Sequence, residues 1–219
     1  MKENTQKSIS ESKIFKIPIE NYENEIDTEF WNPKKSEILD LFTNFSKLRS
    51  MKEFDEIEYD LRQAIELENP ESIKIYLSET IENESQDLRF KIDKESRTAS
   101  LFRVNKETED LIVPQSVKYE SYDYLITSIV GTGAKIKTIK FAEDSAVKSI
   151  HESAFNKTEI EEIYLPSSLT ELKNGWSSYT EKLRIIVPPT NNNLKFVDDT
   201  YLVSKSDQNS DEFDVLQFV

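Results

Sequence analysis

The feature that most restricts the fold of this chain is an internal repeat in its carboxy-terminal half. The segment IKTIKF (Ile136 to Phe141) recurs as IEEIYLP (Ile160 to Pro166) and again as KLRIIVP (Lys182 to Pro188). A second apolar pair follows the first two segments (Val147 with Ile150, and Leu169 with Leu172), and then a small residue next to an aromatic one, Ala154-Phe155 and Gly175-Trp176. The unit is about 22 to 24 residues long, which is a period typical of solenoids.

A solenoid explains this spacing physically. Side chains of a short strand point inward, the chain turns, and the second apolar pair closes the far wall of the coil. Each coil then buries its faces only against its neighbours. We therefore expect the strands containing Ile139, Ile163 and Ile185 to be parallel neighbours in that order. Within one coil, four residues should be buried together: Leu165, Leu169, Leu172 and Trp176.

The repeat resembles a known family. The order Leu-Pro-x-x-Leu-x-x-Leu, followed by Ala-Phe or Gly-Trp, resembles the BspA-like leucine-rich repeats of bacterial surface proteins and parasitic protists. SIHESAFNKTEIEEIYLPSSLTELKNGW is similar to the protist form. KFVDDTYLVSKSDQNSDEFDVLQFV resembles a β-hairpin inserted between repeats. The resemblance implies a protein-binding or surface-antigen role, and it transfers no catalytic residue and no cofactor.

Two departures from the family pattern stand out. Gly131-Thr132-Gly133-Ala134 replaces the Ala-Phe corner in the first unit. The chain also ends at Val219, where the pattern would continue, so we interpret residues 86–219 as a truncated repeat domain. Its first part should be a β-hairpin from Leu88 to Val104, followed by short strands in LIVPQSV and YDYLITSI.

Upstream of the repeats, the pattern indicates an arm and then helices. Residues 1–32 are acidic and lack a sustained period, so we expect a flexible arm whose first 30 residues are dispensable for folding. One apolar patch, from Ile14 to Ile19, is either a segment that docks on its own domain or a linear docking motif. Residues 33–85 carry apolar stripes of about three helices. The fold class is thus α+β, with N-terminal helices followed by a short leucine-rich-repeat β-solenoid with hairpin caps.

The helical stripes also have start signals. Ser36, after Pro33, is a candidate N-cap, and Asn69-Pro70-Glu71 is a strong start for the third helix, whose stripe runs to Ile81. Residues 60–79 resemble the helix pair of one degenerate ankyrin repeat. Because a single such repeat cannot bury its own faces, we interpret it as a helical cap or adaptor.

Composition excludes several kinds of chemistry. The chain has no cysteine and one histidine, His151, which leaves no thiol catalysis, no disulfides and no histidine-rich metal site. GTGAK (Gly131 to Lys135) lacks the frame of a phosphate loop. We expect His151 and Glu161-Glu162 to face solvent, and Asp198-Asp199 to form a hairpin turn. We therefore predict no enzyme, no catalytic residue, no metal and no cofactor.

Charge limits the partners. The net charge is −14, and both halves of the chain are acidic, so neither nucleic acid nor an anionic membrane is an expected partner. No apolar run reaches the ~18 residues that a membrane span needs. The amino terminus has no apolar signal segment, which predicts a cytoplasmic protein. The family resemblance instead implies the cell surface.

Two surfaces are candidates for contact with a protein partner of unknown identity. The first is the outward face of the stacked strands, where six residues should lie side by side: Thr138, Lys140, Glu162, Tyr164, Arg184 and Ile186. The second is the C-terminal segment, which should pair with Tyr201 to Lys205 and leave an edge open to self-association through Phe213, Val215, Leu216 and Phe218.

The sequence therefore predicts a non-catalytic protein–protein interaction module of the surface-antigen or adhesion type. One alternative is an intracellular adaptor that recruits one partner with its helices and another with its repeats. A second alternative is a truncated paralogue without a function of its own.

Overall fold

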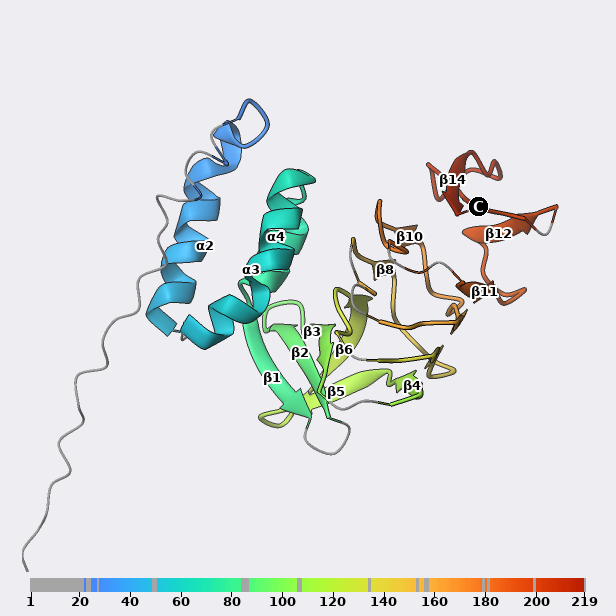
Figure 1. Cartoon of the computed structure of the whole chain (residues 1–219), viewed down its shortest axis with the longest axis horizontal. Helices are drawn as coiled ribbons and strands as arrows, with labels where there is room; N and C mark the ends of the chain where they lie inside the picture. The colour runs from blue at the N-terminus through green and yellow to red at the C-terminus, as the bar shows by residue number, and fades with distance from the viewer. Residues whose placement is uncertain are drawn as a thin grey trace, which may run out of the picture. The chain divides into compact units, whose positions relative to one another are not determined.

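The computed structural model describes residues 22, 25, 26, 28–48, 51–83, 87–105, 108–133, 135–152, 154, 155, 158–178, 180, 182–198 and 200–218. Contacts divide the chain into two compact units, Met1–Leu77 and Ser78–Val219 (Figure 1). Within the described ranges, no helix is both long enough and apolar enough to cross a membrane.

The first unit contains the three expected helices: α2 (Lys35–Leu48), α3 (Met51–Glu66) and α4 (Pro70–Tyr76), preceded by a short 3₁₀ turn, η1 (Asn32–Lys34). Because α2 begins at Lys35, Ser36 lies inside the helix and is not its cap. The start of α4 is as expected, since the Asn69 side chain accepts a hydrogen bond from the Ser72 N–H at 3.2 Å and Pro70 occupies the first turn.

The core of the helical unit reaches further upstream than the sequence indicated. Tyr22, Ile26 and Trp31 are fully buried. The Tyr22 ring packs against Phe42 at 5.0 Å and against Phe54 at 6.1 Å between centroids. The expectation of a flexible acidic arm up to residue 32 is therefore wrong from Tyr22 onward, because Tyr22 packs against Phe42 of α2 and Phe54 of α3. The apolar patch from Ile14 to Ile19 lies outside the described residues.

Helices α3 and α4 pack together as a pair, joined by Leu67–Asn69. The residues expected to pack in this pair are all buried: Leu61, Ala64, Ile73, Tyr76 and Leu77. Its correspondence to an ankyrin repeat stays a prediction.

The helical region is shorter than expected at its other end. Ile81, which extended the third helical stripe, lies in strand β1 (Glu79–Asn83). This strand pairs antiparallel with β2 (Leu88–Asp93) and belongs to the second unit. The division of the chain thus falls after Leu77, eight residues before the predicted boundary at residue 85. Backbone pairing with β2 overrides the helical spacing of Ile81.

The second unit is a solenoid with two walls. One wall, sheet A, has the strand order β1-β2-β3-β6-β8-β10, with β5 paired to β6. Its further strands are β3 (Thr98–Val104), β5 (Ser116–Tyr119), β6 (Tyr122–Ile129), β8 (Ser149–Ile150) and β10 (Glu171–Leu172). The hairpin β2–β3 is antiparallel, as predicted, whereas β3, β6, β8 and β10 are parallel neighbours.

The other wall, sheet B, is entirely parallel in the order β11-β9-β7-β4. Its strands are β4 (Asp110–Val113), β7 (Thr138–Phe141), β9 (Glu162–Tyr164) and β11 (Arg184–Ile186). Ile139 pairs with Ile163 and Ile163 with Ile185, which confirms the predicted order. Among the described residues, three coils contribute one strand to sheet B and one to sheet A: β4 and β6 in the first, β7 and β8 in the second, and β9 and β10 in the third.

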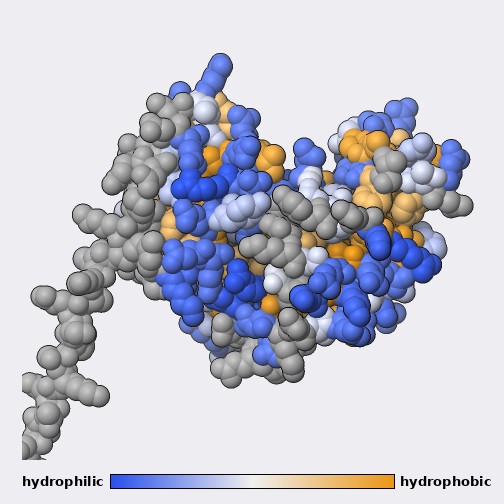
Figure 2. Space-filling model, in the orientation of Figure 1, coloured by the Kyte–Doolittle hydropathy of each residue, from blue (hydrophilic) through white to orange (hydrophobic). Residues whose placement is uncertain are grey.

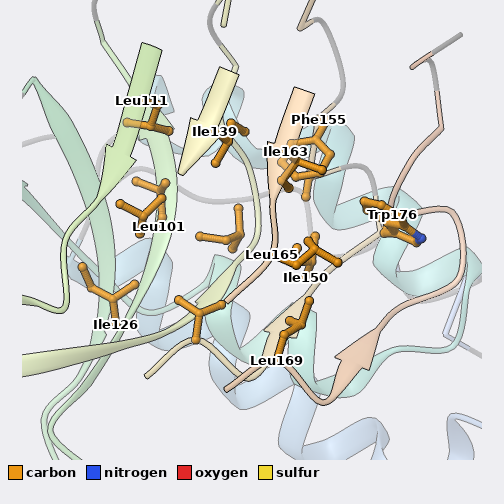
Figure 3. Packing of buried hydrophobic residues seen from close by; sticks show 14 of the residues in the cluster. Leu101, Leu111, Ile126, Ile139, Ile150, Phe155, Ile163, Leu165, Leu169 and Trp176 are labelled. Carbon is orange, nitrogen blue, oxygen red and sulfur yellow. The ribbon is translucent and has the colours of Figure 1, made fainter. Parts of the chain in front are cut away.

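Apolar side chains from both walls fill the interior of the coils. Figure 3 shows Leu111, Ile139 and Ile163 side by side on neighbouring strands of sheet B, above Leu101, Ile126, Ile150 and Leu169. Leu165, Leu169, Leu172 and Trp176 are all buried, as predicted. Burial of each side chain of this size stabilises the fold by roughly 1.5–3 kcal/mol. Because each coil buries these side chains against its neighbours, the coils depend on one another for stability.

The corners of the coils are filled by an aromatic column. Phe155 and Trp176, from successive coils, are 6.0 Å apart between ring centroids. In the preceding coil, Thr132 takes this place, and its hydroxyl donates to the Ala154 carbonyl at 3.2 Å. Gly131 is required there because an added Cβ would lie 2.8 Å from the Phe102 carbonyl oxygen. The described part of GTGAK, Gly131–Gly133, is thus a tight crossing between coils.

A third sheet covers the last coil. Sheet C is an antiparallel meander of β12 (Leu194–Val197), β13 (Tyr201–Ser204) and β14 (Val215–Phe218). Leu194 and Leu202 are fully buried in the solenoid core. The segment that resembles an inserted hairpin thus folds back over the last coil and caps it.

Asn191 marks the transition from the coils to this cap. The offset of Arg184 from its partner Glu162 places Asn191 where the previous coil has Leu169. Its amide nitrogen donates to the carbonyls of Pro166 and Leu169 at 3.0 and 3.1 Å. Its amide oxygen accepts from the N–H groups of Asn193 and Leu194 at 2.8 and 2.9 Å. One polar side chain thus satisfies backbone groups of two coils where the apolar repeat stops.

Candidate functional site

The outward face of sheet B carries two rows of side chains, and each strand contributes one residue to each row. Alternation along the strands sends Ile139 and Ile163 inward and their neighbours outward. The register places Ile112 beside Lys140 and Tyr164 beside Ile186. We call the series Ile112, Lys140, Tyr164 and Ile186 the outer row. The predicted neighbours of Tyr164 are thus found in place, and Ile112, which the sequence analysis missed, extends the series to β4.

The second series, the polar row, consists of Asp110, Thr138, Glu162 and Arg184. Glu162 lies between Thr138 and Arg184, as predicted. Arg184 Nη1 lies 2.9 Å from Glu162 Oε1, although the arginine side chain is 76% exposed. An exposed pair of this kind contributes little to stability and mainly fixes side-chain positions.

Tyr164 is the centre of the face. It is 37% exposed, and Lys140 Nζ lies 5.1 Å from the centroid of its ring. A hydrogen bond to the Glu162 carboxylate raises the pKa of the Tyr164 hydroxyl above its ordinary value. The Lys140 ammonium thus lies over the ring and the Glu162 carboxylate accepts from its hydroxyl, while part of the side chain remains exposed to solvent. At β4, Ile112 is 63% exposed, which makes it the most exposed large apolar side chain among the described residues.

Two concave sites flank the face. A groove of about 320 Å³ lies just past the carboxyl ends of the strands and takes residues from three successive coils: Lys140–Glu143, Tyr164–Ser167, Pro188 and Thr190. A smaller, charged site of about 240 Å³ lies at the amino ends. There, Lys137 Nζ is 2.6 Å from Glu109 Oε1, and Lys135 Nζ is 3.6 Å from Glu159 Oε1. Only the first groove combines apolar and polar walls.

The C-terminal edge is partly as predicted. Strand β14 pairs with β13 and is the last strand of sheet C, so its other side is an edge. Phe218 is half-buried against Trp176, at 6.2 Å between ring centroids, and the Trp176 indole N–H donates to the Gln217 carbonyl at 3.4 Å. Phe213 and Val215 are also half-buried, whereas Leu216 is 58% exposed. Figure 2 shows hydrophobic colour at the surface around β14.

The remaining sequence candidates lie apart from these surfaces. His151 is buried, so the expectation that it faces solvent is wrong. Its imidazole Nε2 lies 3.3 Å from the Ser149 hydroxyl oxygen. Its backbone N–H donates to the Ile129 carbonyl of the neighbouring strand. Glu161 is exposed and Glu162 belongs to the polar row. Asp198 lies at the β12–β13 turn with φ of 52°, and Asp199 lies outside the described residues. Across the described ranges, acidic and histidine side chains do not gather in a group that could hold a metal ion.

The helical unit has a cavity of its own that the sequence did not indicate. It measures about 530 Å³ and is lined by Glu25, Thr28, Trp31, Tyr59, Arg62, Gln63, Ile65, Glu66 and Glu68. The Trp31 indole donates to the Ile65 carbonyl at 3.2 Å, and Arg62 forms ion pairs with Glu25 and Glu58. These contacts link Glu25 and Trp31, upstream of α2, to Arg62 and Ile65 of α3.

No family model matches the sequence, and no curated protein matches it. Three solved structures are similar in backbone. The pneumococcal vaccine antigen PcpA is 15% identical with a TM-score of 0.29, over 58% of this chain and 54% of that chain. A leucine-rich cell surface protein from Faecalibacterium prausnitzii A2-165 is 12% identical with a TM-score of 0.23, over 58% and 59%. A leucine-rich-repeat protein from Bacteroides ovatus ATCC 8483 is 18% identical with a TM-score of 0.21, over 47% and 40%.

The chain thus spans about half the length of the solved structures that it matches. At these TM-scores the likeness carries no further weight, and the strand register determines the architecture. Helices precede coils of about 22 to 24 residues whose short parallel strands stack in two walls. The fold is therefore α+β, with a β-solenoid of the leucine-rich-repeat type.

Proposed function

We propose that this chain is a non-catalytic protein-binding module of the BspA-like kind, and that it binds its partner through the outward face of sheet B. The observation that carries the proposal is the outer row. Ile112 and Tyr164 are large and exposed side chains on β4 and β9, two strands of sheet B that are separated by β7, and exposed aromatic side chains are typical anchors of protein interfaces. The sequence of the repeats supports the BspA-like family, and this resemblance implies display at the cell surface.

The choice of binding over catalysis follows from the chemistry of this face. Beside Tyr164, Glu162 and Arg184 neutralise each other as an ion pair, and the Lys140 ammonium lies over the tyrosine ring. A catalytic site needs a group whose pKa is matched to proton transfer, held within reach of a reacting atom. The face instead offers apolar area with fixed charges at its rim, which is the composition of a binding surface.

A second candidate function is an adaptor with two binding units. It is favoured by the division of the chain into two compact units, each with its own buried core. In this role, the helices recruit one partner and the solenoid another. Separate expression of residues 22–77 and 78–219 would test it, because an adaptor requires that each part retain a different partner.

The test of the main proposal compares matched tyrosines. Partners captured by the full chain are quantified against those captured by Tyr164→Ser and by Tyr122→Ser. Tyr122 is a suitable control because it is 50% exposed and lies on β6, in the other wall. We expect Tyr164→Ser to lose specific partners that Tyr122→Ser retains. Equal capture by both variants would contradict the proposal.

A further inference from the structure

The outer row and the groove beside it run in the same direction, across the strands. Each strand of sheet B contributes one residue to the row. The groove takes Phe141 from one coil, Tyr164 and Pro166 from the next, and Pro188 from the third. A ligand that contacts both must therefore lie along the stacking direction of the coils, perpendicular to the strands.

We propose that the occupant of this surface is an amphipathic α-helix of a partner protein, lying across β4, β7, β9 and β11. The inference rests on the proposed function of sheet B and names the kind of partner. Neighbouring strands are about 4.8 Å apart, so the row advances about 14 Å over its three steps. A helix rises about 1.5 Å per residue, so the positions i, i+3, i+7 and i+10 advance about 15 Å. One helix face thus offers one side chain to each strand.

Other backbone conformations do not present side chains at the spacing of neighbouring strands. An extended strand presents a side chain to the same face about every 6.7 Å, so it is out of step by about 6 Å after three strands. A polyproline helix repeats about every 9.3 Å and therefore meets only alternate strands. The α-helix is the common backbone whose apolar stripe matches the coil spacing at every strand.

Charges beside the row determine which helix fits. The Lys140 ammonium lies over the Tyr164 ring, and Lys140 forms no ion pair within the described part of the chain. Glu143, on the groove wall, is exposed and likewise has no ion pair among the described residues. Glu162 and Arg184 neutralise each other. The helix should therefore carry an apolar stripe, an acidic residue facing Lys140 and a basic residue facing Glu143.

The inference can be tested by selecting binders to the full chain from two displayed peptide libraries. One library presents randomised positions on a stable helical scaffold, and the other presents linear peptides. We expect enrichment from the helical library, with apolar residues at the positions of the i, i+3, i+7, i+10 series that face Ile112, Tyr164 and Ile186, and an acidic residue at the position that faces Lys140. Binding of the enriched peptides should weaken at least tenfold with Tyr164→Ser and with Ile112→Ser, and should not change with Tyr122→Ser. Lys140→Glu should reverse the preference at the facing position from acidic to basic residues.

The outcomes separate this inference from the proposed function. Linear peptides that alternate in period two or are rich in proline, and whose binding requires Tyr164, would leave sheet B as the binding face and overturn the helix. Enrichment of nothing, or only of peptides indifferent to Tyr164, would overturn both. Loss of a dimer on Tyr164→Ser, seen by light scattering, would mean that a second copy occupies the face and would also overturn the inference. Circular dichroism of each variant verifies that the solenoid is folded.

Discussion

Replacing Asn191 by leucine should destabilise the solenoid, although it restores the apolar residue that the repeat has at this position. Asn191 is buried and forms four hydrogen bonds with backbone groups of two coils. At a net value of about 1 kcal/mol each, these bonds contribute about 4 kcal/mol. A buried leucine side chain regains roughly 2 kcal/mol. The variant should therefore be less stable by about 2 kcal/mol, whereas repeat matching alone predicts a gain of similar size.

Urea unfolding followed by tryptophan fluorescence measures this difference. The chain has two tryptophans, and Trp31 lies in the helical unit, so a Trp31→Phe background leaves Trp176 as the reporter of the solenoid. Leu169→Ala serves as the reference, because a cavity in the same coil system should cost about 2–5 kcal/mol. If Asn191→Leu unfolds at the same or a higher urea concentration than the parent, the argument from backbone satisfaction is refuted.

Further predictions concern other parts of the chain. Gly131→Ala should destabilise the solenoid by about 1–3 kcal/mol in the same assay, because its Cβ meets the Phe102 carbonyl; unchanged stability would contradict that close approach. Deleting residues 1–31 removes the buried side chains of Tyr22, Ile26 and Trp31 and should abolish the cooperative unfolding of the helical unit, whereas an unchanged thermal midpoint would restore the arm hypothesis. If β14 mediates self-association, Leu216→Lys should lower the mass seen by sedimentation at high concentration without loss of stability, and a chain that is monomeric throughout would exclude that edge. Partial desolvation raises the pKa of Asp93, but hydrogen bonds from the Ser96 hydroxyl and from two backbone N–H groups outweigh it and lower the pKa below its ordinary value. Its stabilising effect on the β2–β3 turn should be present above about pH 4 and lost as the pH falls through the lowered pKa, so the difference in thermal midpoint between the parent and Asp93→Ala should shrink in acid.

The coils could be predicted because repetition fixes register. Once Ile139, Ile163 and Ile185 align, their alternation also places Lys140 and Tyr164 outward, which is why most of the outer row could be found from the sequence. Ile112 was missed because its unit contains the additional hairpin β5–β6, which stretches the offset between Asp110 and its partner Thr138 to 28 residues. Period counting has no means of anticipating such an insertion.

The ends of the domain were harder to predict because they depend on contacts that are distant in sequence. Ile81 fits a helical stripe as well as a strand, and only pairing with β2 decides between them. Tyr22 and Ile26 stand isolated among acidic residues, and their burial depends on α2 and α3. Asn191 resembles an ordinary loop residue. Its role is visible only when Pro166 and Leu169, more than twenty residues away, present their carbonyls to it.

The cap formed by sheet C has a consequence for how such a protein can change in length. Because the last coil is closed by residues unlike those of the repeat, new coils cannot simply be appended beyond β11 without displacing Leu194 and Leu202 from the core. Duplication of one 22-residue unit between β9 and β11 would preserve both ends and insert a single strand into each wall. Each duplication would lengthen the outward face by about 4.8 Å. The interior of the array is thus the place where the reach of the protein can be adjusted one step at a time.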